Sequence, residues 1–308
     1  MNKILLIGSA NMDLSMNLYR VPEPGETVLD DGGIAYTPGG KGANSAVAFA
    51  KLGANCLFCT KLGADAHGQR LFNYYKEVGI NTSCIKVDQE NPTGLAVVMK
   101  EADGSNRIVV YPGANSRLTK ENIIDAFASE PDALYLGFEI PYMTAVAAAK
   151  VAAARGIPVF IDAAPASKEY DLSLLPPVEV FSPNETECFE YTGIMPTGTE
   201  SCLKAAYALL GMVKAKYIVI KLGARGAFVF DGKHFDLIPA YRAEKVVDTT
   251  AAGDTFTAAL TIEYLRSGNI ANAVRYGAAA AAIAVSRNGA GASVPSEAEV
   301  IAFLQGRK

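Results

Sequence analysis

Short apolar runs alternate with longer helical patterns along most of the chain. Several of the runs lack the polar alternation of a half-exposed strand, which is typical of strands buried on both faces of a parallel sheet. They cover residues 4–7, 56–60, 133–136, 158–161, 179–181, 217–222 and 227–230. Helical patterns between them cover residues 43–52, 68–78, 142–154 and 201–213, and Gly53 and Gly79 follow two of them at positions typical of helix ends. This alternation predicts a doubly wound α/β fold with a mostly parallel central sheet flanked by helices.

Two stretches depart from this pattern. Residues 14–36 are strand-like with Pro and Gly but no helix, and residues 94–100 face 107–111 across a turn signal at Asp103-Gly104. They predict a small additional β-sheet, either a lid over a site or an ordinary surface hairpin, and the pattern alone favours neither. The segment 251–285 is almost all helical and rich in alanine, and no linker or repeat is visible. We therefore expect one domain, residues 1–308, with the lid around 14–36 and 94–111.

Charge and hydropathy exclude several classes of protein. The chain has 28 Lys and Arg against 32 Asp and Glu, a net charge of −4, with no long block of one sign. This argues against a nucleic-acid or anionic-membrane partner. The most apolar stretch, residues 277–285, is far shorter than the roughly 20 residues of a membrane span. The apolar run after Met1 is too short for a signal peptide, so a cytoplasmic protein is expected.

The cysteines give no sign of disulfides or zinc. Five cysteines are an odd number, and they are scattered, unlike a disulfide framework. Cys56 and Cys59 have ligand-like spacing, but in a strand they would point to opposite faces, and no second pair exists. Any catalysis must then use carboxylates, amides and backbone groups, with or without a hard metal ion.

The glycine-rich segment 37–44 is not a known nucleotide loop. It lacks the Walker A arrangement, because Ala35 stands where the first glycine belongs and Gly42 where Ser or Thr belongs. It also lacks G-x-G-x-x-G, because Ser45 takes the third glycine position. A flexible turn entering a helix remains, whose backbone can approach a ligand closely beside the amide of Asn44. A turn that merely needs positive φ angles is an equal alternative.

The strongest local signal is the segment 246–256. Two valines lead into small residues that open a long helix, with Phe256, Leu260 and Leu265 spaced for one buried face. Backbone N–H groups at such a helix start stabilise an anion. By itself Asp254 is an ordinary acid of a first helical turn, but beside a bound phosphate it could accept the proton of an attacking hydroxyl.

Four segments, in order, resemble motifs of the ribokinase-like (PfkB) carbohydrate kinase family. They are Gly8-Ser-Ala-Asn-Met-Asp13, Gly39-Gly-Lys-Gly-Ala-Asn44, Asn184-Glu-Thr-Glu187 and Asp248-Thr-Thr-Ala-Ala-Gly-Asp254. The second is similar to ribokinases rather than to fructokinases or adenosine kinases. The resemblance spans almost the full length and implies a ribokinase-like fold and ATP-dependent phosphorylation of the 5-hydroxyl of D-ribose.

Other functions stay open at this point. The chain could be a kinase for another sugar or nucleoside, such as deoxyribose, fructose or another keto-sugar, or a sensor that binds sugar or nucleotide without transfer. A nicotinamide-dependent oxidoreductase suits the fold class, but no G-x-G-x-x-G follows the first strand. The resemblance also implies a homodimer through the lid strands.

The resemblance implies a role for each matching residue. The sugar would be bound by Asn11, Asp13, Gly40, Lys41, Gly42, Asn44, Glu139 and Asp254. Catalysis would use Asp254 as general base, with an anion hole from the amides of Ala251, Ala252 and Gly253. ATP would be bound by Asn184, Glu187, Lys221, Gly223, Arg225, Gly226, Gly253 and Ala278, with Gly277 also near the adenine.

It also implies two cations. Mg²⁺ would be organised by Glu187 through water, and K⁺ would be bound by Asp248, Thr250, Ala284, Arg287, Gly289 and Ser293. Two positions depart from the family pattern. Gly137 stands two residues before Glu139, where ribokinases commonly have a polar residue, often Gln, and Ala278 replaces a His. The first departure weakens the inference to ribose in particular.

Overall fold

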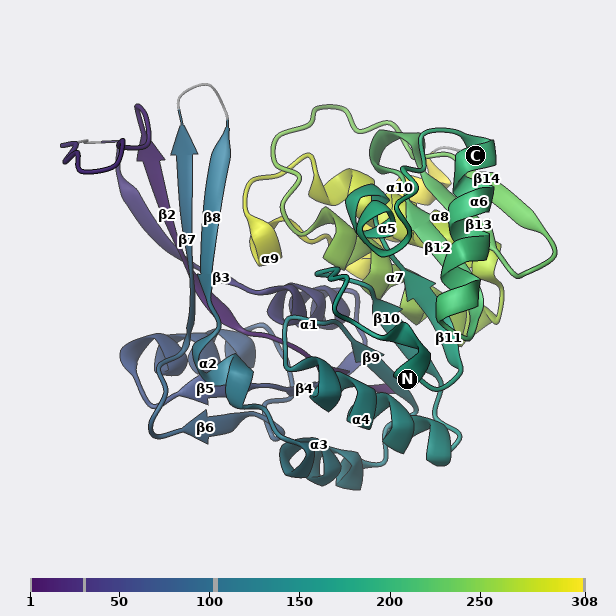
Figure 1. Ribbon diagram of the computed structural model, residues 1–308, viewed down its shortest axis with the longest axis horizontal. Coiled ribbons are helices and arrows are strands. Elements are labelled where there is room, and N and C mark those ends of the chain that lie inside the picture. The colour runs from purple at the N-terminus through teal and green to yellow at the C-terminus, as the bar shows by residue number, and fades with distance from the viewer. Residues whose placement is uncertain (1, 30–31, 102–104, 307–308) are drawn as a thin grey trace.

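The computed structural model describes residues 2–29, 32–101 and 105–306, which build a main sheet covered by helices and a smaller sheet beside it. The main sheet has the strand order β14-β13-β12-β11-β10-β9-β1-β4 (Figure 1). Its strands are β1 (Lys3–Ile7), β4 (Asn55–Cys59), β9 (Ala133–Leu136), β10 (Val159–Asp162), β11 (Val178–Ser182), β12 (Ala215–Lys221), β13 (Ala227–Phe230) and β14 (Phe235–Ile238).

The main sheet is mostly parallel, as predicted. The six strands from β12 to β4 run parallel, and β13 and β14 add an antiparallel edge. All seven predicted strands are present, each with bounds within two residues of those expected.

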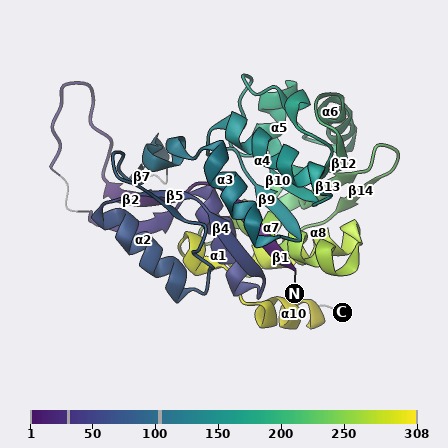
Figure 2. The same cartoon turned by 90° about the horizontal axis from the view of Figure 1, so that it is seen from below.

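Helices cover both faces of the main sheet (Figure 2). One face packs against α1 (Lys41–Lys51), α2 (Ala66–Glu77), α7 (Ala252–Ser267), α8 (Ile270–Ala284) and α10 (Glu297–Gln305). The other packs against α3 (Lys120–Ala126), α4 (Tyr142–Ala154), α5 (Glu185–Thr192) and α6 (Thr199–Met212). None of the described helices combines the length and the apolarity that a membrane span requires.

The apolar strands read as continuous runs because both of their faces are buried. In β1, Ile4 and Leu6 belong to one core while Leu5 and Ile7 belong to the core on the opposite face. Cys56 and Cys59 are divided between the two cores in the same way, as their spacing predicts. All five cysteines are buried and unpaired.

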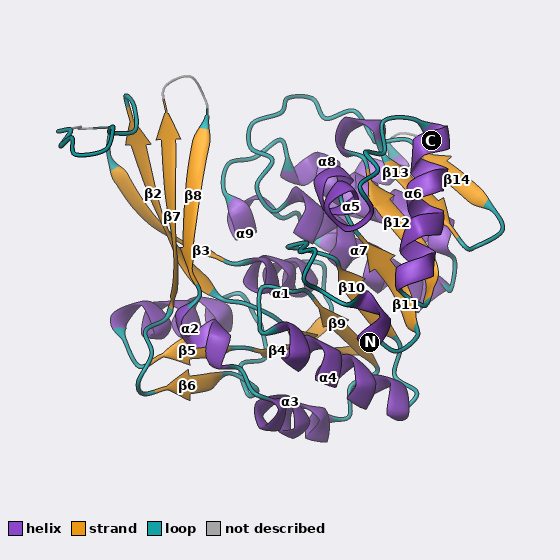
Figure 3. Cartoon of the chain, in the orientation of Figure 1, coloured by secondary structure: helices purple, strands orange, loops and turns teal. Residues whose placement is uncertain are grey.

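A separate four-stranded sheet stands out from the main body (Figure 3). Its order is β3 (Ile34–Gly39), β2 (Asn11–Leu18), β7 (Gly94–Glu101), β8 (Asn106–Tyr111). β7 and β8 form the expected antiparallel hairpin, with Leu95 opposite Tyr111. Its predicted turn at Asp103 and Gly104 lies outside the described residues.

The small sheet begins earlier than the sequence indicates. β2 starts at Asn11, so Asn11 and Asp13 lie in this sheet, paired with β3 and β7, and not in a loop that follows β1. Two further strands, β5 (Lys61–Gly63) and β6 (Lys86–Asp88), pair with each other. The short helix α9 (Ala290–Ser293) lies near β3.

Candidate active site

Polar side chains gather where the parallel strands of the main sheet end. Asp162 ends β10 and Lys221 ends β12, and α5 and α7 begin at the same edge. The small sheet meets this edge through β2, whose first residue Asn11 follows closely on β1. In open α/β sheets ligands bind outside the carboxyl ends of the strands, so this edge is the candidate site.

Asp254 is a buried carboxylate in the first turn of α7. It is 5% exposed, and its Oδ2 accepts a 2.8 Å hydrogen bond from Nδ2 of Asn44. Burial raises the pKa of Asp254 to about 6, and the charge of Lys41 opposes this rise. A carboxylate that titrates near neutral pH is suited to accept a proton from a hydroxyl group.

The chain enters α7 through a tight turn at Ala251. Ala251 adopts a left-handed φ of 59°, which turns the chain into the helix. The Ala252 amide donates to the Thr249 carbonyl (3.2 Å) within this turn. The first N–H groups of a helix have no partner within it, and its start carries partial positive charge. The start of α7 can therefore stabilise an anion directly beside Asp254.

Glu139 ties the glycine-rich turn to the end of β1. Its Oε2 accepts hydrogen bonds from the hydroxyl of Ser9 (2.5 Å) and the backbone N–H of Lys41 (2.9 Å). Gly42 lies so close to this segment that a Cβ there would come within 2.5 Å of the Ser9 nitrogen, and Gly40 has a positive φ of 89°. Close approach and positive φ thus both require glycine in this turn.

Asp13 faces the same turn with an unpaired oxygen. Its Oδ1 is buried and accepts no hydrogen bond from the described part of the chain. Burial, together with the nearby charge of Glu139, raises the pKa of Asp13 to about 7. A Cβ on Gly39 would lie 2.0 Å from Oδ2 of Asp13, so a side chain at position 39 would displace this carboxylate. A buried acceptor without a donor is a place for a ligand hydroxyl.

Asn115 fixes the position of Asn11 and has no signal in the sequence. It lies in the 3₁₀ helix Gly113–Arg117, and its Nδ2 donates to Asn11 Oδ1 (2.8 Å) and to the Ala10 carbonyl (3.1 Å). Its Oδ1 accepts from the Ala10 N–H (2.9 Å). The two asparagines are 104 residues apart, and no motif surrounds Asn115.

Asn184 and Glu187 form a capping box at the start of α5. The Glu187 N–H donates to Asn184 Oδ1 (2.8 Å), and the Asn184 N–H donates to Glu187 Oε2 (2.7 Å). Burial raises the pKa of Glu187, and Lys221 opposes this rise. The two residues therefore hold each other in place next to the end of β12.

The turn after β12 contains the other predicted nucleotide-binding residues. Gly223 and Gly226 both have positive φ, and a Cβ on Gly226 would lie 2.0 Å from the Ile238 carbonyl oxygen. The guanidinium of Arg225 pairs with Glu185 (2.5 Å) and donates to the carbonyl of Thr197 (2.7 Å). Arg225 thereby holds the loop that follows α5.

Two small residues of α8 complete the predicted nucleotide set. A Cβ on Gly277 would lie 2.8 Å from the Phe256 carbonyl oxygen, so glycine lets α8 approach α7 closely. Ala278 is buried beside it.

The segment before α7 is connected to the segment after α8. Oδ1 of Asp248 accepts from the N–H (2.9 Å) and hydroxyl (2.6 Å) of Thr250, and Oδ2 accepts from the Gly289 N–H (3.1 Å). The Arg287 N–H donates to the Ala284 carbonyl (3.1 Å), and the Ser293 hydroxyl donates to the Ala290 carbonyl (2.7 Å).

This connected segment contains the residues that were predicted to hold K⁺. Its donor atoms are carbonyl, hydroxyl and carboxylate oxygens, which such ions prefer. Among the described residues no three His, Cys, Asp or Glu side chains cluster as metal ligands.

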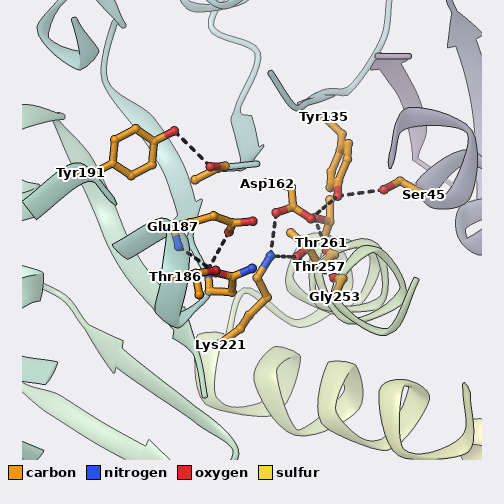
Figure 4. Close-up of polar contacts among 12 residues, drawn as sticks. Ser45, Tyr135, Asp162, Thr186, Glu187, Tyr191, Lys221, Gly253, Thr257 and Thr261 are labelled. Atoms are coloured by element: carbon orange, nitrogen blue, oxygen red, sulfur yellow. Dashed lines mark hydrogen bonds and ion pairs between the residues drawn. The ribbon is translucent and has the colours of Figure 1, made fainter. Parts of the chain in front are cut away.

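Asp162 belongs to a buried network and is a site residue that no sequence motif predicts (Figure 4). Its Oδ1 accepts from Nζ of Lys221 (2.6 Å), and its Oδ2 accepts a longer bond from the hydroxyl of Tyr135 (3.4 Å). The same hydroxyl is hydrogen-bonded to Ser45 of α1 (3.1 Å). The available signal was an acidic residue directly after the predicted buried strand 158–161.

Comparisons with known proteins agree with this arrangement. A family model described as pfkB family carbohydrate kinase matches residues 1–297. Ribokinase of Haemophilus influenzae is 35% identical over 305 residues, which cover 98% of each chain. Deoxyribokinase of Salmonella typhi is 33% identical over 295 residues, which cover 95% of each chain. The structure of Arabidopsis thaliana ribokinase complexed with ribose and ATP superposes with a TM-score of 0.88 at 30% identity, covering 99% of both chains.

Proposed function

The chain belongs to the pfkB family of carbohydrate kinases, and from this premise we propose that it is a ribokinase, which transfers the γ-phosphoryl group of ATP to the 5-hydroxyl of D-ribose. The observation that carries the proposal is the hydrogen bond between Asn44 and Asp254 (2.8 Å). It joins the glycine-rich turn to a buried carboxylate at an anion-stabilising helix start. An acceptor hydroxyl, a base and a phosphoryl group could meet there.

In the proposed reaction Asp254 is the general base. It takes the proton of the sugar hydroxyl as the oxygen bonds to the γ-phosphorus, and the bond from that phosphorus to the leaving ADP oxygen breaks. We assign stabilisation of the charge on the transferred group to the start of α7, with the amides of Ala251, Ala252 and Gly253; the Ala252 amide would share its hydrogen with the Thr249 carbonyl. Phosphoryl transfer needs positioning and charge stabilisation rather than a covalent intermediate on the enzyme. We therefore assign no residue as an enzyme nucleophile.

The sugar would be bound between β2 and the glycine-rich turn. Asp13 has an unpaired buried oxygen, and one carboxylate can accept two neighbouring hydroxyls. The remaining sugar contacts are assigned to Asn11, Gly40, Lys41, Gly42, Asn44 and Glu139. Tight hydrogen bonding of Glu139 and Asn11 by the protein supports this assignment, because it fixes both groups before the sugar arrives.

ATP would lie along the edge formed by α5, the turn after β12 and α8. The assigned residues are Asn184, Glu187, Lys221, Gly223, Arg225, Gly226, Gly253 and Ala278. A contact between Arg225 and ATP would add to the bonds that Arg225 already makes with Glu185 and Thr197. Mg²⁺, held through water by Glu187, would neutralise phosphate charge. K⁺ would be held by oxygens of Asp248, Thr250, Ala284, Arg287, Gly289 and Ser293, where it would fix the backbone at the start of α7.

The small sheet is proposed to act as a lid on a single 1–308 domain. Closing over the sugar would exclude water and prevent wasteful hydrolysis of ATP. The lid also presents large apolar side chains to solvent, with Ile34 65%, Ile108 56%, Val109 61% and Tyr111 54% exposed. A surface of this kind supports a homodimer in which lid strands pack together.

Deoxyribose is the second candidate substrate. It is favoured by the similarity to a deoxyribokinase. It is also favoured by Gly137, which stands two residues before Glu139, where ribokinases commonly have a polar residue. An assay of ADP release across pentoses, deoxyribose, hexoses and nucleosides distinguishes these possibilities. We expect D-ribose to have the highest kcat/KM. A higher value for another sugar would overturn the proposal while the family assignment remained.

A further inference from the structure

The buried ion pair between Lys221 and Asp162 spans an intervening strand. Asp162 ends β10 and Lys221 ends β12, with β11 between them. Neighbouring strands are about 4.8 Å apart, so the lysine must reach across the end of β11 to place Nζ 2.6 Å from Oδ1 of Asp162. Both side chains are almost fully buried, at 11% and 7% exposure.

A contribution to the stability of the fold does not account well for such a buried ion pair. Removing two charges from water costs about as much as their attraction returns, and apolar residues of similar volume often stabilise a fold as well. Burial lowers the pKa of Lys221, but the carboxylates of Asp162 and Glu187 outweigh this effect and raise it above its ordinary value. The side chain therefore stays a charged ammonium inside the candidate site.

The ammonium lies next to the start of α7. A Cβ built on Gly253 would be 3.8 Å from Nζ of Lys221. The hydroxyl of Thr257 is 3.5 Å from Nζ and donates to the Gly253 carbonyl (3.0 Å). Asp162 and Thr257 account for two of the three N–H donors of an ammonium, which leaves one for a ligand oxygen.

The second carboxylate oxygen of Asp162 is also held by a hydrogen bond. Its Oδ2 accepts from the Tyr135 hydroxyl, which is bonded to Ser45 on α1, the helix that carries Asn44 (Figure 4). A carboxylate fixed by two elements can hold a flexible lysine in one direction. The network thus connects α1, which contains Asn44, to the Lys221 ammonium beside the start of α7.

We infer that Lys221 is a catalytic residue that donates a hydrogen bond to an oxygen of the γ-phosphoryl group during transfer, and that Asp162 is the positioning residue that aims it. The inference rests on the proposed phosphoryl transfer. In that step the sugar oxygen bonds to phosphorus, the bond from phosphorus to ADP breaks, and Asp254 takes the hydroxyl proton. Lys221 keeps its proton throughout and compensates charge only.

The test compares three variants with wild type. Lys221→Met removes the ammonium group. Asp162→Asn keeps the ammonium but removes the carboxylate that orients it. The double variant removes both charges, so no unpaired carboxylate stays buried. The matched control is Lys216→Met in the same strand, because Lys216 also pairs with a carboxylate, Glu179 (2.5 Å), but is 55% exposed and lies near the opposite end of β12.

We expect Lys221→Met and the double variant to lose kcat equally, by about 10²–10³-fold, with the KM for the sugar changed less than about threefold. Asp162→Asn should lose less. Affinity for ADP with aluminium fluoride, which mimics the transferred group, should fall far more than affinity for ADP alone. Lys216→Met should match wild type in all of these measurements.

Two outcomes overturn the inference. One is a double variant that remains folded by thermal melting and retains kcat within about threefold of wild type. The other is an equal loss of affinity for ADP and for ADP with aluminium fluoride, which would make Lys221 a general nucleotide contact. Failure of the proposed function looks different, because wild type itself would then phosphorylate no sugar.

Discussion

Asn44 of α1 and Asp254 of α7 are joined by a 2.8 Å hydrogen bond, although 210 residues separate them in the chain. The donor belongs to the glycine-rich segment 37–44, which is assigned to the sugar, and the acceptor is the proposed base. The bond orients the carboxylate and favours its ionised form, because Asn44 lowers the pKa of Asp254 against the effect of burial. Proton acceptance and sugar binding therefore depend on one contact.

Replacing Asn44 by Leu should move the pH dependence of turnover. Without the donor the pKa of Asp254 rises, so the base is protonated over more of the range below neutrality. We expect kcat at neutral pH to fall by about tenfold and the acidic limb of the kcat profile to shift to higher pH. Steady-state kinetics across pH measure both. An unshifted limb would show that Asn44 acts on sugar binding alone.

Asp254→Asn should separate binding from chemistry. The amide keeps the shape of the side chain but cannot accept the hydroxyl proton, so kcat should fall by about 10²–10⁴-fold. The dissociation constant of the sugar, measured by calorimetry, should change little. Asp236→Asn on the exposed strand β14 is the control and should behave as wild type. Near-normal turnover by Asp254→Asn would refute its role as base.

Carboxylates with raised pKa values should make the ligand-free protein less stable as the pH rises towards neutrality. Asp13 and Asp254 have pKa values of about 7 and about 6 in the fold, against 3.8 when unfolded. Between roughly pH 4 and pH 7 the folded state therefore holds more protons, so the free energy of unfolding falls with increasing pH. We expect a higher melting temperature near pH 5.5 than near pH 7.5.

The variant Asp13→Asn tests the source of this trend. It removes one of the groups whose pKa is raised in the fold, so the slope of melting temperature against pH should become smaller. A slope equal to that of wild type would mean that other groups govern stability in this range.

Gly39→Ala should weaken sugar binding specifically. The added Cβ would lie 2.0 Å from Oδ2 of Asp13 and would force that carboxylate to move. We expect the KM for the sugar to rise at least tenfold, equivalent to about 1.4 kcal/mol, with the KM for ATP little changed. Gly198→Ala is the matched control, because a Cβ there meets nothing within 4 Å. Equal kinetics for the two variants would contradict the assignment of Asp13.

Turnover should depend on a monovalent cation through Asp248. Replacing K⁺ by tetramethylammonium, which is too large for a site of backbone oxygens, should lower kcat several-fold in wild type. In Asp248→Asn the anchor of Thr250 and Gly289 is weakened, so kcat should start lower and respond less to K⁺. Wild-type turnover that is indifferent to the exchange would exclude an activating cation.

The sequence predicts the main sheet well because both faces of its strands are buried. Strands such as residues 133–136 are continuous apolar runs, and their bounds agree with the structure. The helix start at Asp254 is equally visible, because small residues, an acid and an apolar helix face are neighbours in the chain. Features whose residues all lie within one short segment can therefore be predicted from the sequence.

Contacts between segments that are distant in the chain cannot be predicted in this way. The partners of Asn115 and Asp162 are set by the packing of separate elements, and an isolated asparagine or aspartate carries no local pattern. The start of β2 at Asn11 was missed for a similar reason. Its pairing with β7 brings together residues 83 positions apart, such as Asn11 and Gly94.

The position of β1 has a consequence for how the protein is made. Lys3–Ile7 is synthesised before the other strands of the main sheet, yet it lies inside that sheet, where Ile4 pairs with Ala133 of the neighbouring strand β9. Until β9 is synthesised, one hydrogen-bonding edge of this strand, which is apolar from Ile4 to Ile7, lacks the partner that it has in the folded sheet. Unpaired apolar edges promote aggregation. We therefore expect the nascent chain to need chaperone protection through the first half of its synthesis, and truncation of β1 to prevent folding.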